Sequence, residues 1–207
     1  MSMESHDEVT RLWLIRHGQP QGDAQGRCYG RLDVGLSIEG RRQITGVAAH
    51  LAGVPLGAVY CSPRRRAVES AHLIAAGHSL TPTPVEGLSE LSFGDFEGLT
   101  YEEIERDYPS LYQQWMESPT GIQFPNGEGF TTMQHRVLEA ARVLRRRHQG
   151  ESLAIVSHGG VNRILLADAL EMSPARIFRI GQRYAAANRI DYFDSEPLVE
   201  TINECWY

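Results

Sequence analysis

Residues 11–18 read Arg-Leu-Trp-Leu-Ile-Arg-His-Gly, an apolar run that ends in an arginine, a histidine and a glycine. A short apolar run with a turn signal behind it is typical of a buried strand, which here stops at Arg16 and His17. Residues 57–63 and 152–160 repeat the pattern, ending in Ser-Pro and in Ser-His-Gly-Gly. We therefore expect three buried strands, each of which carries polar residues at its carboxyl end.

Helical periodicity fills the segments between these runs. Apolar residues recur every three or four positions in four stretches, which are residues 37–51, 63–75, 130–148 and 161–170. Ser37 and the capping box of Thr100 and Glu103 mark two helix starts, and Pro63 is expected in the first turn of a third helix. Residues 189–193 and 198–202 predict a late hairpin. This alternation predicts an α/β fold with a mostly parallel central sheet.

The stretch from about residue 92 to 129 interrupts the alternation. It is rich in glycine, proline and aromatic residues, among them Phe93, Tyr101 and Trp115. We expect an insertion that lies over one end of the sheet, with its aromatic residues forming a small core rather than a cage around a base. Residues 1–207 are expected to form a single domain that includes this insertion.

Composition excludes several classes of protein. The 207 residues carry a formal charge of −6, and 42% of them are hydrophobic, as in ordinary globular domains. No apolar run is long enough to cross a membrane, and the net negative charge argues against nucleic acid as a partner. The three cysteines do not predict a disulfide framework or a cysteine zinc site. We expect a cytoplasmic protein without a membrane partner.

The sequence contains no lysine, so all twenty basic residues are arginines. This excludes a Schiff-base lysine, the lysine of a phosphate-binding P-loop, and a Ser-Lys hydrolase. An anion site in this chain must therefore use arginine, histidine and backbone N–H groups. The planar guanidinium of arginine suits phosphate and carboxylate equally well.

The three strand ends are expected to meet at one edge of the sheet, where ligands of α/β proteins bind. A neutral imidazole is a nucleophile toward phosphorus, and neighbouring arginines lower the pKa of a histidine and keep it neutral. His17 and His158 therefore suggest phosphoryl transfer, with arginines stabilising the transition state. Glu90, which follows the strand-like residues 83–86, is the candidate acid. Partial burial or a neighbouring carboxylate would have to keep its proton in place.

These residues resemble the histidine phosphatase superfamily, which includes cofactor-dependent phosphoglycerate mutases. Residues 14–18 look like its Arg-His-Gly signature. Further similar segments follow in the family's order, at residues 30–40, 62–67, 88–98, 125–128 and 156–161. The resemblance covers roughly residues 11–170. It implies a three-layer α/β/α fold, metal-independent chemistry and no cofactor.

The resemblance also implies a role for each matching residue. His17 would be the nucleophile that forms a phosphohistidine, and Glu90 would be the proton donor. The phosphate would be held by Arg16, Arg66, His158 and the N–H of Gly159.

The chain departs from the family pattern just after the signature. Gln19 and Pro20 stand where the family usually has Glu-Thr, and Asp23 stands where it often has asparagine. Because an aspartate would repel phosphate, Asp23 is expected to point away or to contact another part of the substrate. Gln19, Asp23 and Arg31 are candidate substrate contacts.

Residues 93–98 look more like the phosphatases of the superfamily than the mutases. Residues 26–36 and 126–130 are similar to α-ribazole phosphatases, which remove the 5′-phosphate of α-ribazole 5′-phosphate during cobalamin assembly. The leading hypothesis is this phosphomonoesterase, whose insertion could stack the base of the substrate. The alternatives are a phosphoglycerate mutase, a broad sugar-phosphate phosphatase, a non-catalytic phospho-ligand binder and a metal-assisted hydrolase. A small phosphorylated substrate is the expected partner, and a homodimer is left open.

Overall fold

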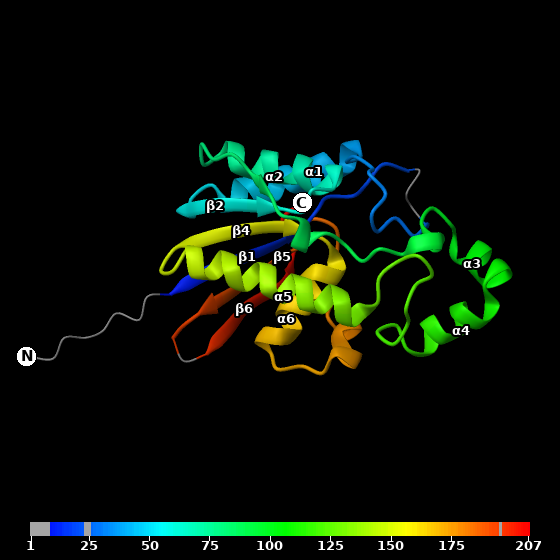
Figure 1. The fold of residues 1–207 in the computed structure, drawn as a ribbon. Coiled ribbons are helices and arrows are strands. Elements are labelled where there is room, and N and C mark those ends of the chain that lie inside the picture. Colours follow the sequence, from blue (N-terminus) through cyan, green and yellow to red (C-terminus); the bar gives the residue numbers. More distant parts are fainter. Residues whose placement is uncertain (1–8, 23–25, 195) are drawn as a thin grey trace, which may run out of the picture.

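A computed structural model describes residues 9–22, 26–194 and 196–207. Within them, six strands form one sheet in the order β3-β2-β4-β1-β5-β6 (Figure 1). The strands are β1 (Thr10–Arg16), β2 (Leu56–Cys61), β3 (Thr83–Pro84), β4 (Ser152–Ser157), β5 (Ala187–Tyr192) and β6 (Pro197–Glu204). Strands β3, β2, β4 and β1 are parallel, whereas β5 and β6 form an antiparallel hairpin beside β1. The predicted α/β fold with a mostly parallel sheet and a late hairpin is confirmed.

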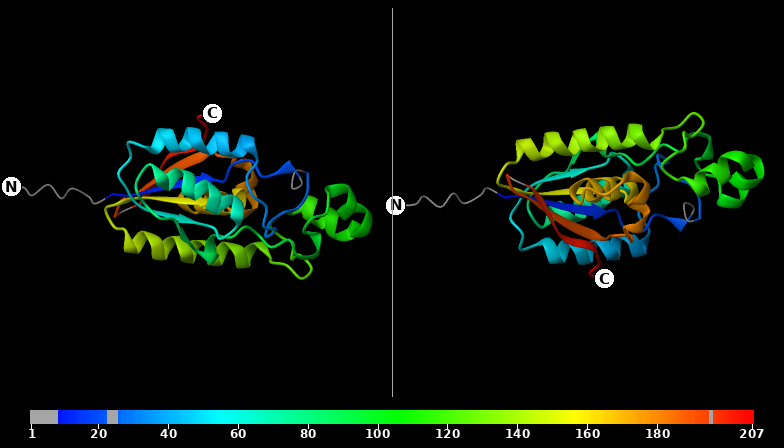
Figure 2. Two further views of the ribbon diagram at one scale, coloured as in Figure 1. Left: turned by 90° about the horizontal axis from the view of Figure 1, so that it is seen from above. Right: turned by 90° about the horizontal axis from the view of Figure 1, so that it is seen from below.

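Helices cover both faces of the sheet, as the two views in Figure 2 show. One face carries α1 (Ile38–Leu51) and α2 (Arg65–Ala76), and the other carries α5 (Phe130–Arg147) and α6 (Gly159–Ala169). The 3-10 helix η2 (Glu86–Leu88) packs against α5, and η4 (Pro174–Arg179) packs against α6. Three layers result, as the family resemblance implies. No helix in the described ranges is long and apolar enough to cross a membrane.

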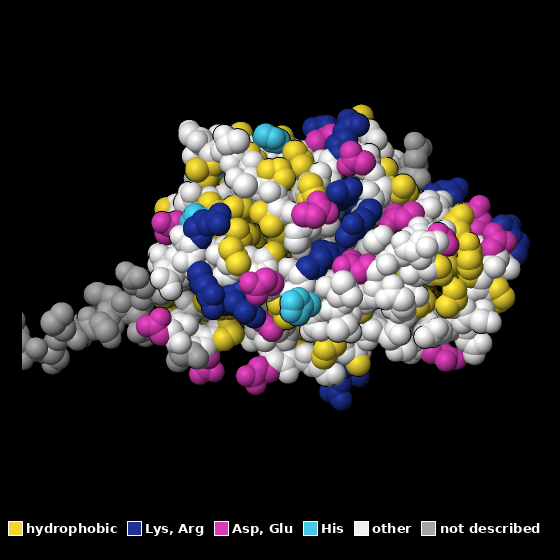
Figure 3. Space-filling model, viewed as in Figure 1, with side chains coloured by type: hydrophobic (Ala, Val, Ile, Leu, Met, Phe, Trp, Pro, Cys, Tyr) yellow, Lys and Arg dark blue, Asp and Glu magenta, His cyan; other side chains and the backbone are white. Residues whose placement is uncertain are grey.

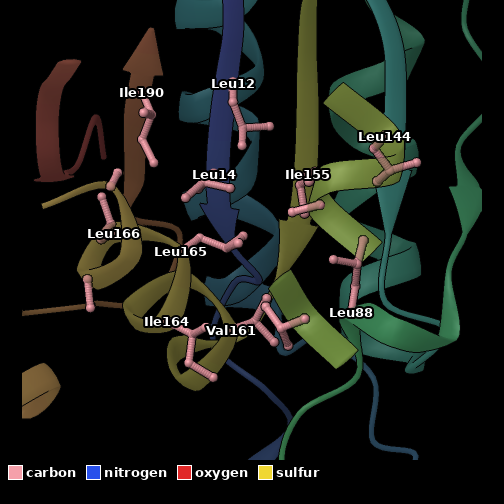
Figure 4. Close-up of a cluster of buried hydrophobic side chains, with 14 of the residues drawn as sticks. Leu12, Leu14, Leu88, Leu144, Ile155, Val161, Ile164, Leu165, Leu166 and Ile190 are labelled. Carbon is pink, nitrogen blue, oxygen red and sulfur yellow. The ribbon is translucent and has the colours of Figure 1, made fainter. Parts of the chain in front are cut away.

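Successive side chains of β1 point to opposite faces of the sheet, so they contribute to two separate hydrophobic cores. Leu12 and Leu14 lie in the cluster beneath α5 and α6 (Figure 4), whereas Trp13 and Ile15 pack beneath α1 and α2. Successive side chains of a strand point to opposite faces, so a strand covered on both sides is apolar throughout. This is why residues 11–15 read as one continuous run.

Two helices begin at different residues from those expected. The side chain of Asp33 accepts a hydrogen bond from the N–H of Arg65 (2.8 Å), so α2 begins at Arg65, and Pro63 precedes the helix instead of lying in its first turn. The cap comes from a distant loop, which local sequence does not reveal. Helix α6 begins at Gly159, two residues before the expected start. The expected starts at Ser37 and Thr100 are confirmed by their side-chain caps.

The insertion lies beyond the carboxyl ends of the parallel strands (Figure 1). It contains η3 (Gly94–Phe96), α3 (Tyr101–Asp107) and α4 (Pro109–Glu117). Its aromatic side chains pack into a third core of their own around Phe96, Trp115 and Phe124. The expected small core is therefore confirmed. A bridge between Arg27 and Thr100 ties it to the loop that follows β1.

Candidate active site

The three predicted strand ends meet at one point. His17 follows β1, His158 follows β4 at the N-cap position of α6, and Arg66 lies in the first turn of α2 after β2. The N–H of His17 continues the ladder to Ser157 (2.9 Å), which places the two histidine rings 5.2 Å apart, centroid to centroid. All three side chains are buried. The parallel sheet therefore brings the predicted histidines and the predicted arginine together.

The hydrogen bonds of His17 define which nitrogen can react. Its Nδ1 lies 2.7 Å from the carbonyl oxygen of Gly18. A carbonyl only accepts, so Nδ1 carries the hydrogen and the lone pair is on Nε2. That lone pair accepts a hydrogen bond from Nε of Arg66 (3.3 Å). Burial and then the charges of Arg66 and Arg16 hold the pKa of His17 well below its usual 6.5. The result is a neutral imidazole whose Nε2 is available as a nucleophile.

His158 is held neutral in the same way. Its Nδ1 lies 3.3 Å from Nη2 of Arg66, which can only donate, and its Nε2 lies 2.7 Å from the hydroxyl of Ser62. Burial is the largest cause that lowers its pKa, followed by the charge of Arg66. Arg66 therefore contacts both histidines from one fixed position.

Backbone carbonyls hold the two arginines. Arg66 donates to the carbonyls of Leu32 (2.8 Å) and Gly30 (2.6 Å). Arg16 donates through Nη1 to the carbonyl of Gln182 (2.5 Å), and its buried Nε has no partner within the described residues. A buried donor without a partner is costly, and an anionic ligand would satisfy it.

Glu90 reaches the same place from the segment after η2. One carboxyl oxygen accepts the N–H of Gly160 in the first turn of α6 (3.1 Å), and the other accepts the N–H of Leu91 (3.0 Å). A Cβ on Gly160 would lie 2.4 Å from this carboxyl group, so only glycine allows the approach. The side chain is half-buried.

These groups form the floor of a pocket of about 390 Å³. Its remaining wall is largely apolar and includes Phe93, Trp115 and Met116 of the insertion, Met133 of α5 and Phe178 of η4. Most ligand sites combine such an apolar wall with a few polar groups that orient the ligand.

Three residues of the site carry no signal that singled them out in the sequence. The hydroxyls of Tyr29 and Tyr184 lie 2.9 Å apart, and their rings lie beneath the guanidinium groups of Arg66 and Arg16 at 4.9 and 4.2 Å. Arg163 also lines the pocket, and its Nε donates to the carbonyl of Ile180 (2.9 Å). Tyr29 lies within residues 26–36, the segment that is similar to α-ribazole phosphatases, whereas nothing local marks Tyr184.

Two of the three candidate substrate contacts lie away from the pocket. The backbone of Gln19 bonds Gln43 and Ser37 beside α1, and Arg31 is exposed with its N–H bonded to Glu97. Neither residue lines the pocket, so substrate contact stays a prediction for both. Asp23 lies outside the described residues.

The family model of the histidine phosphatase superfamily (branch 1) matches residues 12–205. The chain belongs to the histidine phosphatase superfamily. Among solved structures of the superfamily, a putative α-ribazole-5′-P phosphatase from Escherichia coli superposes with a TM-score of 0.87 at 28% identity. The match covers 94% of this chain and 96% of the other. The predicted family and fold are thus confirmed.

Relatives in the superfamily carry several names. An adenosylcobalamin/alpha-ribazole phosphatase of Escherichia coli is 30% identical, over 83% of this chain and 86% of its own length. Phosphoserine phosphatase 1 of Hydrogenobacter thermophilus is 28% identical, over 94% and 92%. A bifunctional protein of Mycobacterium tuberculosis is 32% identical over 96% of this chain, which spans only 55% of that protein.

Proposed function

We propose that the chain is a phosphomonoester hydrolase that works through a phosphohistidine on His17. The observation that carries this proposal is the neutral Nε2 of His17, fixed by the carbonyl of Gly18 and facing Arg66. A nucleophile whose lone pair already meets a guanidinium is positioned for a phosphoryl group held by the same arginine. A phospho-ligand binder without catalysis would not need a histidine held in this tautomer.

The reaction proceeds in two steps. In the first, Nε2 of His17 forms a bond to phosphorus, the bond from phosphorus to the ester oxygen breaks, and Glu90 gives its proton to the leaving alkoxide. In the second, a water oxygen forms a bond to phosphorus, the bond from phosphorus to Nε2 breaks, and Glu90 takes a proton from the water, which releases phosphate and restores both side chains. Arg16, Arg66 and His158 stabilise the charge that spreads over the phosphoryl oxygens.

The pocket supports an ester whose alcohol carries a flat apolar group, and α-ribazole 5′-phosphate is the substrate we propose. Phe93, Trp115 and Phe178 line the wall beyond Glu90, and an aromatic group gains from contact with such rings. Relatives from Escherichia coli and Salmonella typhimurium are named adenosylcobalamin/alpha-ribazole phosphatases, which agrees with this choice. Phosphoserine is the comparison substrate because other relatives are named phosphoserine phosphatases.

The proposal is tested by phosphate release from α-ribazole 5′-phosphate and from phosphoserine, in EDTA near pH 7. We expect a kcat/KM above about 10⁴ M⁻¹s⁻¹ for the first substrate and a much lower value for the second. His17→Ala should lose turnover by at least about 10³-fold, and the phosphoenzyme of the unaltered chain should be labile in acid and stable in base.

Two results would contradict different parts of the proposal. Full turnover by His17→Ala would show that His17 is not the nucleophile. Equal or faster hydrolysis of phosphoserine would leave the chemistry in place and remove the substrate.

A further inference from the structure

Arg136, on the second turn of α5, uses all five of its N–H donors within the fold. Two bonds of 2.7 Å pair it with the carboxylate of Glu128. The other three go to backbone carbonyls, those of Gly87 (3.0 Å), Ser89 (2.6 Å) and Glu90 (3.1 Å). A guanidinium has five donors in a rigid planar fork, so this side chain is fully committed and cannot serve a ligand.

The three carbonyls belong to the segment that carries the proposed acid. Residues 87–90 lead from η2 to Glu90, and they lie outside the sheet. The segment lies flush on α5, because a Cβ on Gly87 would lie 2.7 Å from Cβ of Ala140. The position of the Glu90 backbone is therefore fixed by α5 and not by a strand.

The partner of Arg136 is held as firmly. The side chain of Glu128 is only 9% exposed, and its N–H donates to the carbonyl of Ser92 (2.9 Å). A buried bidentate pair has a fixed geometry that a point charge does not impose. The carboxylate of Glu128 therefore orients the guanidinium of Arg136.

We propose that Arg136, oriented by Glu128, is a positioning residue that holds the Glu90 carboxyl where it can protonate the leaving alkoxide. The inference rests on the proposed function of Glu90. A displacement of about 1 Å in a catalytic group can cost about 10²-fold in rate. Loss of the three carbonyl contacts frees the segment for such a displacement, while His17 and both phosphate-binding arginines stay in place on other elements.

Esters with different leaving groups distinguish a positioning role of Arg136 from a merely structural role. The ratio kcat/KM reports the steps up to loss of the alcohol, so it does not include hydrolysis of the phosphohistidine. p-Nitrophenolate leaves as a stable anion without a proton, whereas a simple alkoxide needs one. A misplaced acid therefore lowers kcat/KM more for an alkyl phosphate than for p-nitrophenyl phosphate. General damage to the fold lowers kcat/KM equally for both esters.

The experiment measures kcat/KM for glycerol 2-phosphate and p-nitrophenyl phosphate with four variants. Arg136→Met removes every contact, and Arg136→Lys keeps the charge beside Glu128 but cannot reach three carbonyls. Glu90→Gln is the reference for loss of the acid. Arg142→Met is the matched control, since Arg142 lies on the same helix in an exposed pair with Glu139.

We expect Arg136→Met to lower kcat/KM about 10- to 100-fold for the alkyl ester and less than about 3-fold for the nitrophenyl ester. Arg136→Lys should show the same selectivity, and it decides the matter if Arg136→Met does not fold. Arg142→Met should match the unaltered chain. Equal losses on both esters, or no loss, in the Arg136 variants would overturn the inference while Glu90→Gln remains selective. If Glu90→Gln itself shows no selectivity, the proposed role of Glu90 fails instead.

Discussion

At the scale of single residues, the site is a pair of neutral histidines held among arginine charges. His17 and His158 are both buried, and Arg66 lies within 3.3 Å of a ring nitrogen of each. Burial and positive charge act in the same direction on a histidine, since both disfavour the imidazolium. The arrangement keeps a lone pair on His17 at physiological pH.

This arrangement predicts how stability depends on pH. Because the folded-state pKa of each histidine lies well below 6.5, the unfolded chain binds more protons between that lowered value and pH 6.5. The free energy of unfolding should therefore rise with pH in this window, by up to about 1.4 kcal/mol per pH unit for each histidine, and level off above it. Urea unfolding between pH 5.5 and 7.5, in buffer without phosphate, measures the slope.

His158→Asn serves as the control for this slope. It removes one of the two titrating groups, so the rise between pH 5.5 and 6.5 should fall by about half. Identical slopes in the variant and the unaltered chain would show that other groups cause the pH dependence.

At the scale of elements, the site depends on close backbone contacts at the strand ends. A Cβ on Gly18 would lie 2.3 Å from the carbonyl oxygen of Gly40, and one on Gly40 would lie 2.1 Å from that of Gln19. The turn after β1 therefore lies directly on the first turn of α1, which Ser37 caps. Glycine at both positions lets the backbone that follows His17 pack directly on the first turn of α1.

Gly18→Ala should destabilise the fold, because the added methyl group meets backbone that cannot move as a side chain does. The expected loss is about 1–3 kcal/mol, the usual cost of overpacking. Denaturant unfolding of Gly18→Ala and of Gly53→Ala provides the comparison. Nothing lies within 4 Å of a Cβ on Gly53, so that variant should lose no stability. Equal effects of the two substitutions would show that the Gly18–Gly40 contact is not tight.

At the scale of the whole molecule, distant segments combine to build the pocket wall. The insertion supplies Tyr101 and Trp115, and η4, more than sixty residues later, supplies Phe178. Tyr101 and Phe178 are 44% and 55% exposed, so they line the pocket without belonging to a core. Figure 3 shows hydrophobic side chains gathered on the surface over α3 and α4, beside interspersed acidic and basic groups. In the proposed reaction, the leaving group would contact this wall and the phosphate would lie at the strand ends.

Phe178→Ala should therefore change recognition of the alcohol and spare the phosphate site. We expect KM for phenyl phosphate to rise roughly 2- to 12-fold, which corresponds to about 0.5–1.5 kcal/mol of aromatic contact. KM for a small alkyl phosphate and inhibition by inorganic phosphate should not change. Leu198→Ala, at a leucine of β6 that is about as exposed as Phe178 and lies outside the pocket, is the matched control. Equal changes for both esters would show that Phe178 does not contact the alcohol.

The fold class and the residues at the floor of the pocket could be predicted from local sequence patterns. Buried parallel strands are short and apolar on both faces, so residues 11–15 and 152–157 were readable locally, and the histidines at their ends followed at once. The parallel arrangement then required those ends to meet. The roles of Arg66 and Glu90 could be predicted from the sequence because each residue lies in a segment that resembles the superfamily.

How those groups are held could not be predicted in this way, because the contacts join segments that are far apart in the chain. Arg136 acts on backbone carbonyls, which every residue has, so no pattern of side chains points to that contact. Tyr184 meets Tyr29 from 155 positions away, and Asp33 sets the start of α2 from a separate loop. Sequence patterns report what a residue does to its own element. Contacts between elements depend on which distant segments become neighbours, and that is set only when the whole chain folds.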